Sequence, residues 1–120
     1  MSYLEKINDI YTQLGKGKAL DAFDQYYHSD CDMVLEDGKV VSGKEKNRER
    51  EIEFFSSVED FHGLEIKSIT SNEENATTAV ECTMDVTFKG GDRMQIEQVA
   101  TQKWEGDHIV KERFYGTQQG

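Results

Sequence analysis

Polar side chains interrupt the apolar faces of the last two strands predicted in this chain. In the segment from Met94 to Glu105, alternate residues form one face on which Gln98 and Gln102 stand among apolar neighbours. A dry core excludes such groups, whereas a curved sheet that surrounds a pocket uses them to hold a small molecule. The inward face of the segment from His108 to Tyr115 is expected to consist of His108, Val110, Glu112 and Phe114.

Two carboxylates are candidates for proton transfer. Glu112 is the only carboxylate on the inward face of its strand, and Glu36 follows an apolar run at the end of an early strand. If both face one pocket, burial and mutual repulsion raise at least one pKa toward neutrality, which suits a general acid or base. The alternative for Glu36 is a solvated turn with Asp37-Gly38. The alternative for Glu112 is a structural carboxylate bonded to Arg48 or to a tyrosine hydroxyl.

Other residues are candidates for ligand binding without proton transfer. Gln98 and Gln102 each offer two donors and an acceptor that could orient a carbonyl or hydroxyl group, but neither titrates in the useful range. Aromatic side chains could line the pocket, although aromatic residues at helical spacing also form ordinary core. These aromatic candidates are Tyr11, Tyr27, Trp104 and Phe114.

Metal and cofactor sites are not predicted. The histidines His28, His62 and His108 lie far apart and show no HxxxH or HExxH spacing. Cys31 and Cys82 lack CxxC spacing, so we expect two buried thiols rather than a disulfide or a metal site. The expected chemistry is therefore cofactor-independent.

The composition narrows the possible partners. The 120-residue chain carries a formal net charge of −10, which repels nucleic-acid phosphates and anionic membrane surfaces. It has no apolar run of about 18 residues and no secretory signal, so we expect a cytoplasmic protein with neither a nucleic-acid nor a membrane partner. Proline, repeats and linker-like segments are absent, which predicts one domain over residues 1–120.

The first half of the chain is predicted to contain three helices and a hairpin. An S-x-x-E capping box at Ser2 opens a helix that Gly15 ends, and a second helix closes at residues 28–29. Asp37-Gly38 is typical of a tight turn, which places short strands over residues 32–36 and 39–41. A second S-x-x-E at Ser42 predicts a third helix that ends near Asp60. Its inward face is expected to comprise Arg48, Ile52, Phe55 and Val58.

The second half is predicted to form four antiparallel strands. From Phe61 the apolar period changes to two, most clearly from Val80 to Phe88, and glycine-rich turns separate the later strands. Helices followed by a run of strands predict an α+β fold.

The C-terminal segments resemble those of a known family. Residues 104–110, WEGDHIV, followed by Glu112-Arg113-Phe114-Tyr115, resemble the closing strand-turn-strand of SnoaL-like families within the nuclear transport factor 2-like superfamily. The segment from Val41 to Glu45 resembles the entry to their third helix. The resemblance implies a cystatin-like, nuclear transport factor 2-like α+β barrel: a cone-shaped, strongly bent, mainly antiparallel mixed sheet packed on three N-terminal helices.

The resemblance also implies a pocket between sheet and helices and homodimers formed through the outer sheet face. Glu36 lies close to the position where ketosteroid-isomerase-like relatives carry a carboxylate base. Gly116 stands where many relatives have an acid after the tyrosine, so any role of that acid is missing. Because the superfamily includes cyclases, isomerases, epoxide hydrolases and dehydratases, the resemblance does not fix an activity.

These observations lead to one expectation and one alternative. We expect the chain to bind a small, mostly apolar molecule. If it is an enzyme, we expect cofactor-independent acid–base chemistry of the isomerase, cyclase or hydratase type. The alternative is a non-catalytic ligand-binding or dimerisation module.

Overall fold

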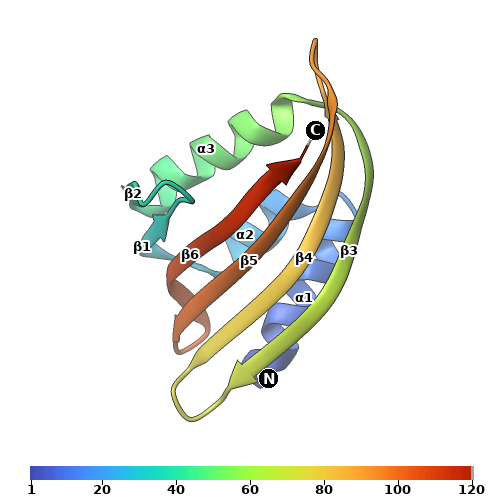
Figure 1. Cartoon of the computed structure of the whole chain (residues 1–120). Helices are drawn as coiled ribbons and strands as arrows, with labels where there is room; N and C mark the ends of the chain where they lie inside the picture. Colours follow the sequence, from blue (N-terminus) through green and yellow to red (C-terminus); the bar gives the residue numbers. More distant parts are fainter. Residues whose placement is uncertain (120) are drawn as a thin grey trace.

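Three helices and six strands make up the part of the chain that the structure describes (Figure 1). The computed structural model describes the backbone of residues 1–119 and the side chains of residues 1–116. The helices are α1 (Tyr3–Gly15), α2 (Ala19–Tyr26) and α3 (Lys44–Ser56). The strands are β1 (Tyr27–Val34), β2 (Val40–Ser42), β3 (Val58–Asn72), β4 (Thr77–Phe88), β5 (Arg93–Glu105) and β6 (His108–Gln119). The predicted α+β class is confirmed.

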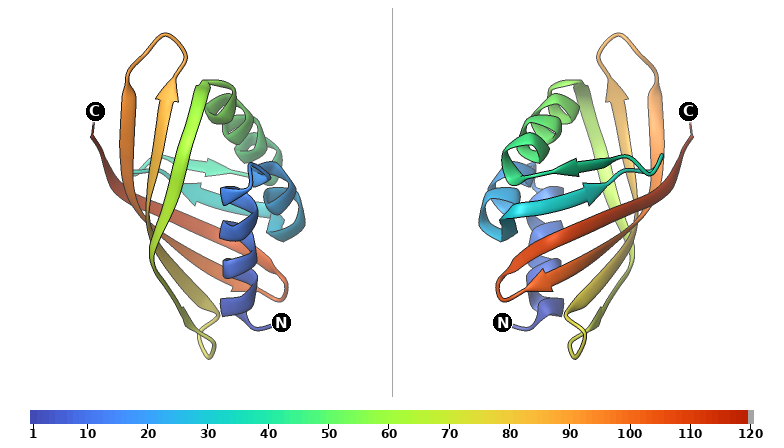
Figure 2. Two further views of the ribbon diagram at one scale, coloured as in Figure 1. Left: turned by 90° about the vertical axis from the view of Figure 1, so that its right-hand side faces the viewer. Right: turned by 90° about the vertical axis from the view of Figure 1, so that its left-hand side faces the viewer.

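All six strands form one mixed sheet in the order β2-β1-β6-β5-β4-β3. Only the β1–β6 pair is parallel, and the other neighbouring pairs are antiparallel. The sheet bends strongly around the helices, which lie on its concave side (Figure 2). Strands β2 and β3 are its two edges and do not pair with each other, so the sheet is open rather than a closed barrel.

Helix α1 begins at the capping box that the sequence predicts. The Ser2 hydroxyl accepts a hydrogen bond from the Glu5 amide, and the Glu5 carboxylate accepts one from the Ser2 amide. Glu73, in the β3–β4 turn, accepts hydrogen bonds from the amides of Tyr3 and Leu4 at 2.8 and 3.1 Å. The turn therefore anchors the start of α1 to the end of the sheet.

Helix α3 departs from its predicted start and its predicted inward face. Gly43, with φ +94°, is the residue before the helix, and no side chain caps it, so Ser42 does not form a capping box. Asn47 is fully buried and donates to the carbonyls of Val41 and Gly43, both at 2.9 Å. Ile52, expected inside, is 38% exposed. Phe55, also expected inside, does face the space between helix and sheet, so the predicted inward face is wrong at Ile52 but right at Phe55.

A β-bulge changes the inward face of β6. Trp104 pairs with Ile109, but the preceding residue Lys103 pairs with Lys111, so Val110 is an extra residue. Ile109 is fully buried and His108 is exposed, so the predicted inward placement of His108 and Val110 is wrong.

The same bulge places Glu112 on the inner face. Beyond it, Glu112 lies opposite Gln102, whose side chain points inward. If regular pairing continued from the turn, Glu112 would lie opposite Thr101 and face outward.

Candidate functional site

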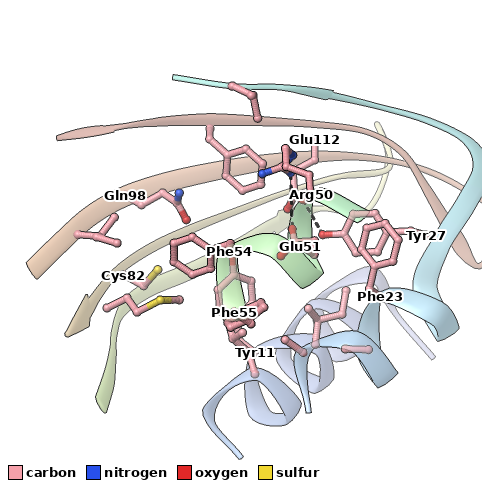
Figure 3. Close-up of a pocket in the computed structure, with 18 of the residues that line it drawn as sticks. Tyr11, Phe23, Tyr27, Arg50, Glu51, Phe54, Phe55, Cys82, Gln98 and Glu112 are labelled. Carbon is pink, nitrogen blue, oxygen red and sulfur yellow. Dashed lines mark hydrogen bonds and ion pairs between the residues drawn. The ribbon is translucent and has the colours of Figure 1, made fainter. Parts of the chain in front are cut away.

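A pocket of about 300 Å³ lies between the concave face of the sheet and the three helices. Most of its wall is apolar, and six aromatic rings contribute to it. Figure 3 shows Arg50, Glu51 and Glu112 close together beside Tyr27 at one end of this pocket, and Gln98 farther along the sheet. The aromatic residues are Tyr11, Phe23, Tyr27, Phe54, Phe55 and Phe114, and the charged or amide-bearing residues are Glu36, Arg50, Glu51, Gln98 and Glu112.

Glu112 is a buried carboxylate on the pocket wall, and the fold supplies a donor to each of its oxygens. Its exposure is 3%. The Tyr27 hydroxyl donates to Oε1 at 2.5 Å, and the Gln102 amide donates to Oε2 at 2.7 Å. Tyr27 lies at the start of β1 rather than on the helix predicted for it, and the parallel β1–β6 pairing brings it next to β6.

A hydrogen-bonded chain fixes the orientation of Gln102. The Trp104 indole N–H can only donate, and it donates to the Thr78 hydroxyl at 2.9 Å. That hydroxyl therefore directs its own proton to Gln102 Oε1, 2.7 Å away. The amide nitrogen of Gln102 is left to face Glu112. We call Trp104, Thr78, Gln102, Glu112 and Tyr27 the buried chain.

The pKa of Glu112 lies near neutrality. Burial raises it from 4.5 to about 7, the Tyr27 and Gln102 donors oppose the rise, and the nearby Glu51 adds to it. Burial and the Glu112 charge also raise the pKa of Tyr27 well above 10, so its hydroxyl remains a donor. Glu112 can therefore take up or release a proton near pH 7, which a general acid or base requires.

Arg50 and Glu51 form a second polar group on α3. Arg50 Nη2 lies 3.6 Å from the Glu51 carboxylate, and the guanidinium carbon lies 6.0 Å from the centre of the Phe114 ring. Burial raises the pKa of Glu51, and the Arg50 charge opposes this rise.

Sequence patterns do not single out Arg50 and Glu51, because α3 carries charged residues around most of its circumference. The signal that could have revealed them is the pair Phe54-Phe55. These rings follow Arg50 and Glu51 by four residues and share their helix face.

Glu36 and Glu112 differ in their surroundings. Glu36 is exposed at the edge of the pocket, next to the turn in which the Leu35 carbonyl accepts from the Gly38 amide at 2.8 Å. The carboxylate that contributes to the raised pKa of Glu112 is Glu51 rather than Glu36.

The remaining candidates divide between the pocket wall and the core. Tyr11, Tyr27, Gln98 and Phe114 line the pocket. Trp104 packs against the rings of α1 and α2 residues, and it reaches the pocket only through the buried chain. Gln102 is 2% exposed and does not line the pocket; its amide donates to Glu112 and accepts from Thr78.

Two structural partners were predicted for Glu112, Arg48 and a tyrosine hydroxyl, and the contacts show which of them it bonds. Arg48 binds Asp24 through two hydrogen bonds, at 2.7 and 3.1 Å, on the exposed side of α3. The partner of Glu112 is instead the Tyr27 hydroxyl.

Within residues 1–119, the structure contains no group of three or more histidine, cysteine, aspartate or glutamate side chains placed to hold a metal ion. Cys31 and Cys82 are both buried free thiols. Among the same residues, no helix has the length and apolar character needed to cross a bilayer.

Residues 4–116 match the SnoaL-like domain family, and this match covers nearly the whole chain. No curated protein gives a significant match. Three solved structures illustrate the similarity in fold, and all are less than 25% identical to this chain.

The first is a candidate SnoaL-like polyketide cyclase from Mesorhizobium loti, with a TM-score of 0.81, 24% identity and coverage of 96% of this chain and 99% of that one. The second is a candidate isomerase from Bacillus subtilis, with a TM-score of 0.80, 12% identity and coverage of 98% and 90%. The third is an LEH-like epoxide hydrolase from M. tuberculosis, with a TM-score of 0.76, 16% identity and coverage of 96% and 82%. These neighbours carry different activities on one fold.

Proposed function

Because the chain belongs to the SnoaL-like domain family, we propose that it binds a small, mostly apolar molecule in the pocket and catalyses cofactor-independent acid–base chemistry on it. The reaction is of the isomerase, cyclase or hydratase type. One observation carries the proposal: Glu112 lies on the pocket wall, buried, with a pKa raised to about 7.

The geometry of Glu112 suits a group that moves protons. Each carboxylate oxygen can accept two hydrogen bonds, and the fold supplies one donor to each, from Tyr27 and from Gln102. Lone pairs therefore remain for a substrate proton. The two donors hold the carboxylate in one orientation, which reduces the reorganisation required at the moment of transfer.

The second candidate function is a non-catalytic ligand-binding module. The completeness of the buried chain favours it, because a carboxylate with donors on both oxygens is also a stable structural element. The two functions differ in what the loss of the Glu112 charge does. An enzyme loses turnover, whereas a binding module keeps its affinity and has no turnover to lose.

A small enolisable ketone provides a direct test. We expect the protein to accelerate the exchange of the methyl protons of 2-acetylnaphthalene for deuterium in D2O, followed by NMR, with a rate that rises through a pKa of about 7. Glu112→Gln should abolish this exchange while the Kd stays within about tenfold, or roughly 1.4 kcal/mol. Glu36→Gln, at the exposed edge of the pocket, is the control that should retain exchange.

Two results would contradict the proposal. Exchange at the uncatalysed rate while the ketone binds would favour the non-catalytic module. Equal exchange by Glu112→Gln and the unmodified protein would remove Glu112 from the mechanism.

We also propose that two copies associate through the outer face of the sheet. Val99 and Tyr115 pair across β5 and β6 and are 36% and 47% exposed. On one side of the Val99–Tyr115 pair, the outer face carries the basic residues Lys103, Lys111 and Arg113. On the other side it carries acidic residues of β4 and β5. A two-fold axis near Val99 would place unlike charges opposite each other.

Val99→Arg should shift the mass measured by light scattering from dimer to monomer, and an unmodified protein that is monomeric would exclude the dimer.

A further inference from the structure

Arg50 is the residue of the pocket wall with the most unused hydrogen-bonding capacity. Its guanidinium carries five N–H donors. Nε is buried without a partner, and Nη2 approaches only the Met33 sulfur, at 3.5 Å, and the Glu51 carboxylate, at 3.6 Å. Among the described residues, Nη1 has no hydrogen-bond partner. The fold therefore brings a cation to the pocket without supplying it with a close acceptor.

A neighbouring arginine shows how a satisfied guanidinium looks in the same helix. Arg48 binds both oxygens of Asp24, at 2.7 and 3.1 Å. A buried N–H group without an acceptor costs free energy, and the cost is larger for a charged group. The position of Arg50 is therefore stabilised when something else in the pocket supplies an acceptor. The Phe114 ring, 6.0 Å from the guanidinium carbon, restricts where that acceptor can lie.

We propose that Arg50 binds a carbonyl oxygen of the ligand, so that the pocket selects an otherwise apolar molecule with a ketone-type group. This inference rests on the proposed function and names its substrate class. A neutral carbonyl suits the pocket better than a carboxylate because Glu51 and Glu112 both line the pocket and repel a further anion. Gln102 does not take this role, since it does not line the pocket and its amide bonds Thr78 and Glu112 instead.

This arrangement gives each charged group one part of a proton transfer. Ionised Glu112 removes a proton from the carbon next to the carbonyl, and the C–H bonding electrons form a carbon–carbon double bond. The carbonyl π electrons move to oxygen, and Arg50 stabilises the resulting enolate oxygen. Protonated Glu112 then returns the proton to the same or a conjugated carbon. The step is balanced without any other reactant.

The test compares two probes that differ in one oxygen: 2-acetylnaphthalene and 2-ethylnaphthalene. Their Kd values are measured by NMR titration for the unmodified protein and for Arg50→Met, Arg50→Lys and Arg48→Met. A hydrogen bond to a charged donor predicts that Arg50→Met lowers the ratio of ketone to hydrocarbon affinity by about ten- to a hundredfold. Arg48→Met, in the same helix but paired with Asp24, should leave the ratio unchanged.

The outcomes separate this inference from the proposed function. An unchanged ratio in Arg50→Met overturns the inference, while loss of exchange in Glu112→Gln would still support the acid–base role. Failure of both probes to bind the unmodified protein overturns both. Should Arg50→Met not fold, Arg50→Lys decides: it keeps the charge but loses the planar donor fork, so a ratio equal to that of the unmodified protein contradicts the inference.

Discussion

The pocket has two polar walls that differ in how completely their hydrogen bonds are satisfied. On the β6 wall, the buried chain runs from the Trp104 indole to the Tyr27 hydroxyl, with every link between 2.5 and 2.9 Å. On the α3 wall, Arg50 meets its two nearest acceptors only at 3.5 and 3.6 Å. The comparison suggests a division of labour: the fold itself sets the protonation of Glu112, whereas Arg50 is left for the ligand.

Breaking the buried chain at its centre should have the largest effect on stability. Gln102→Leu leaves the Thr78 hydroxyl without its acceptor and Glu112 without one donor, and each buried orphan costs about 1–3 kcal/mol. We expect the free energy of unfolding in urea to fall by about 4 kcal/mol. Gln98→Leu, on the same strand but half-buried and with no side-chain hydrogen bond to the described residues, should cost less than about 1 kcal/mol. Equal losses in the two variants would contradict the comparison.

Neutralising Glu112 should change how stability depends on pH. Its folded pKa of about 7 exceeds the unfolded 4.5, so between these values the folded state binds more protons than the unfolded state. The stabilisation that protonated Glu112 contributes is fully present below about pH 4.5 and is lost as the pH rises through 7. The loss reaches at most about 3 kcal/mol.

Glu112→Gln should remove this loss, and urea titrations at pH 5 and pH 8 measure it. The variant should be more stable than the unmodified protein at pH 8 and closer to it at pH 5. A constant difference at both pH values would show that the pKa of Glu112 is not raised.

Removing one hydroxyl from the buried chain should have a moderate effect. Thr78→Val keeps the side-chain shape but leaves the Trp104 N–H and Gln102 Oε1 without partners. Because both of these orphans are neutral, whereas Gln102→Leu also takes a donor from a carboxylate, we expect a smaller loss than in that variant, about 2–3 kcal/mol. Because the amide of Gln102 is then no longer oriented, the apparent pKa in the exchange assay should also shift. Full stability with an unshifted profile would show that the chain does not position Glu112.

The smallest stability change is expected on the α3 wall. Arg50→Met removes a buried N–H group that has no partner, but it also leaves Glu51 without the cation that lowers its pKa, so the free energy of unfolding should fall by about 1 kcal/mol, less than in Gln102→Leu. Thermal or urea unfolding of the protein without ligand measures this change. A loss comparable to that of Gln102→Leu would mean that both walls are structural, and the difference between them would disappear.

Much of the sheet could be predicted from the sequence because a period of two is local information. The alternation from Met94 to Trp104 correctly placed Gln102 and Trp104 inside, since β5 has no bulge in its pairing with β4. The first part of β6 could not be predicted in this way. Its bulge depends on how two strands pair, and alternation within one strand does not record that.

The helices show the same limit: a local pattern predicts a helix face only where its apolar residues are concentrated on one side. The spacing of α1 predicted its cap and its buried face, because its apolar residues are concentrated on one side. In α3 the apolar signal is weak, and Ile52 pointed to the wrong face. Arg50 and Glu51 face inward because Phe54, Phe55 and the fully buried Asn47 orient the helix, and these contacts depend on tertiary structure.

Gly116 restricts where this chain could acquire a further acidic side chain. A Cβ atom at this position would lie 2.3 Å from the Glu97 carbonyl oxygen and 3.2 Å from Gln98 Cα. These obstacles are backbone atoms, so β5 and β6 would have to separate before any side chain could be accommodated. The acid that the family resemblance places after the tyrosine therefore could not be introduced by replacing Gly116 alone without moving the backbone. A lineage with this backbone would have to keep Glu112, or recruit an acid from another strand or helix.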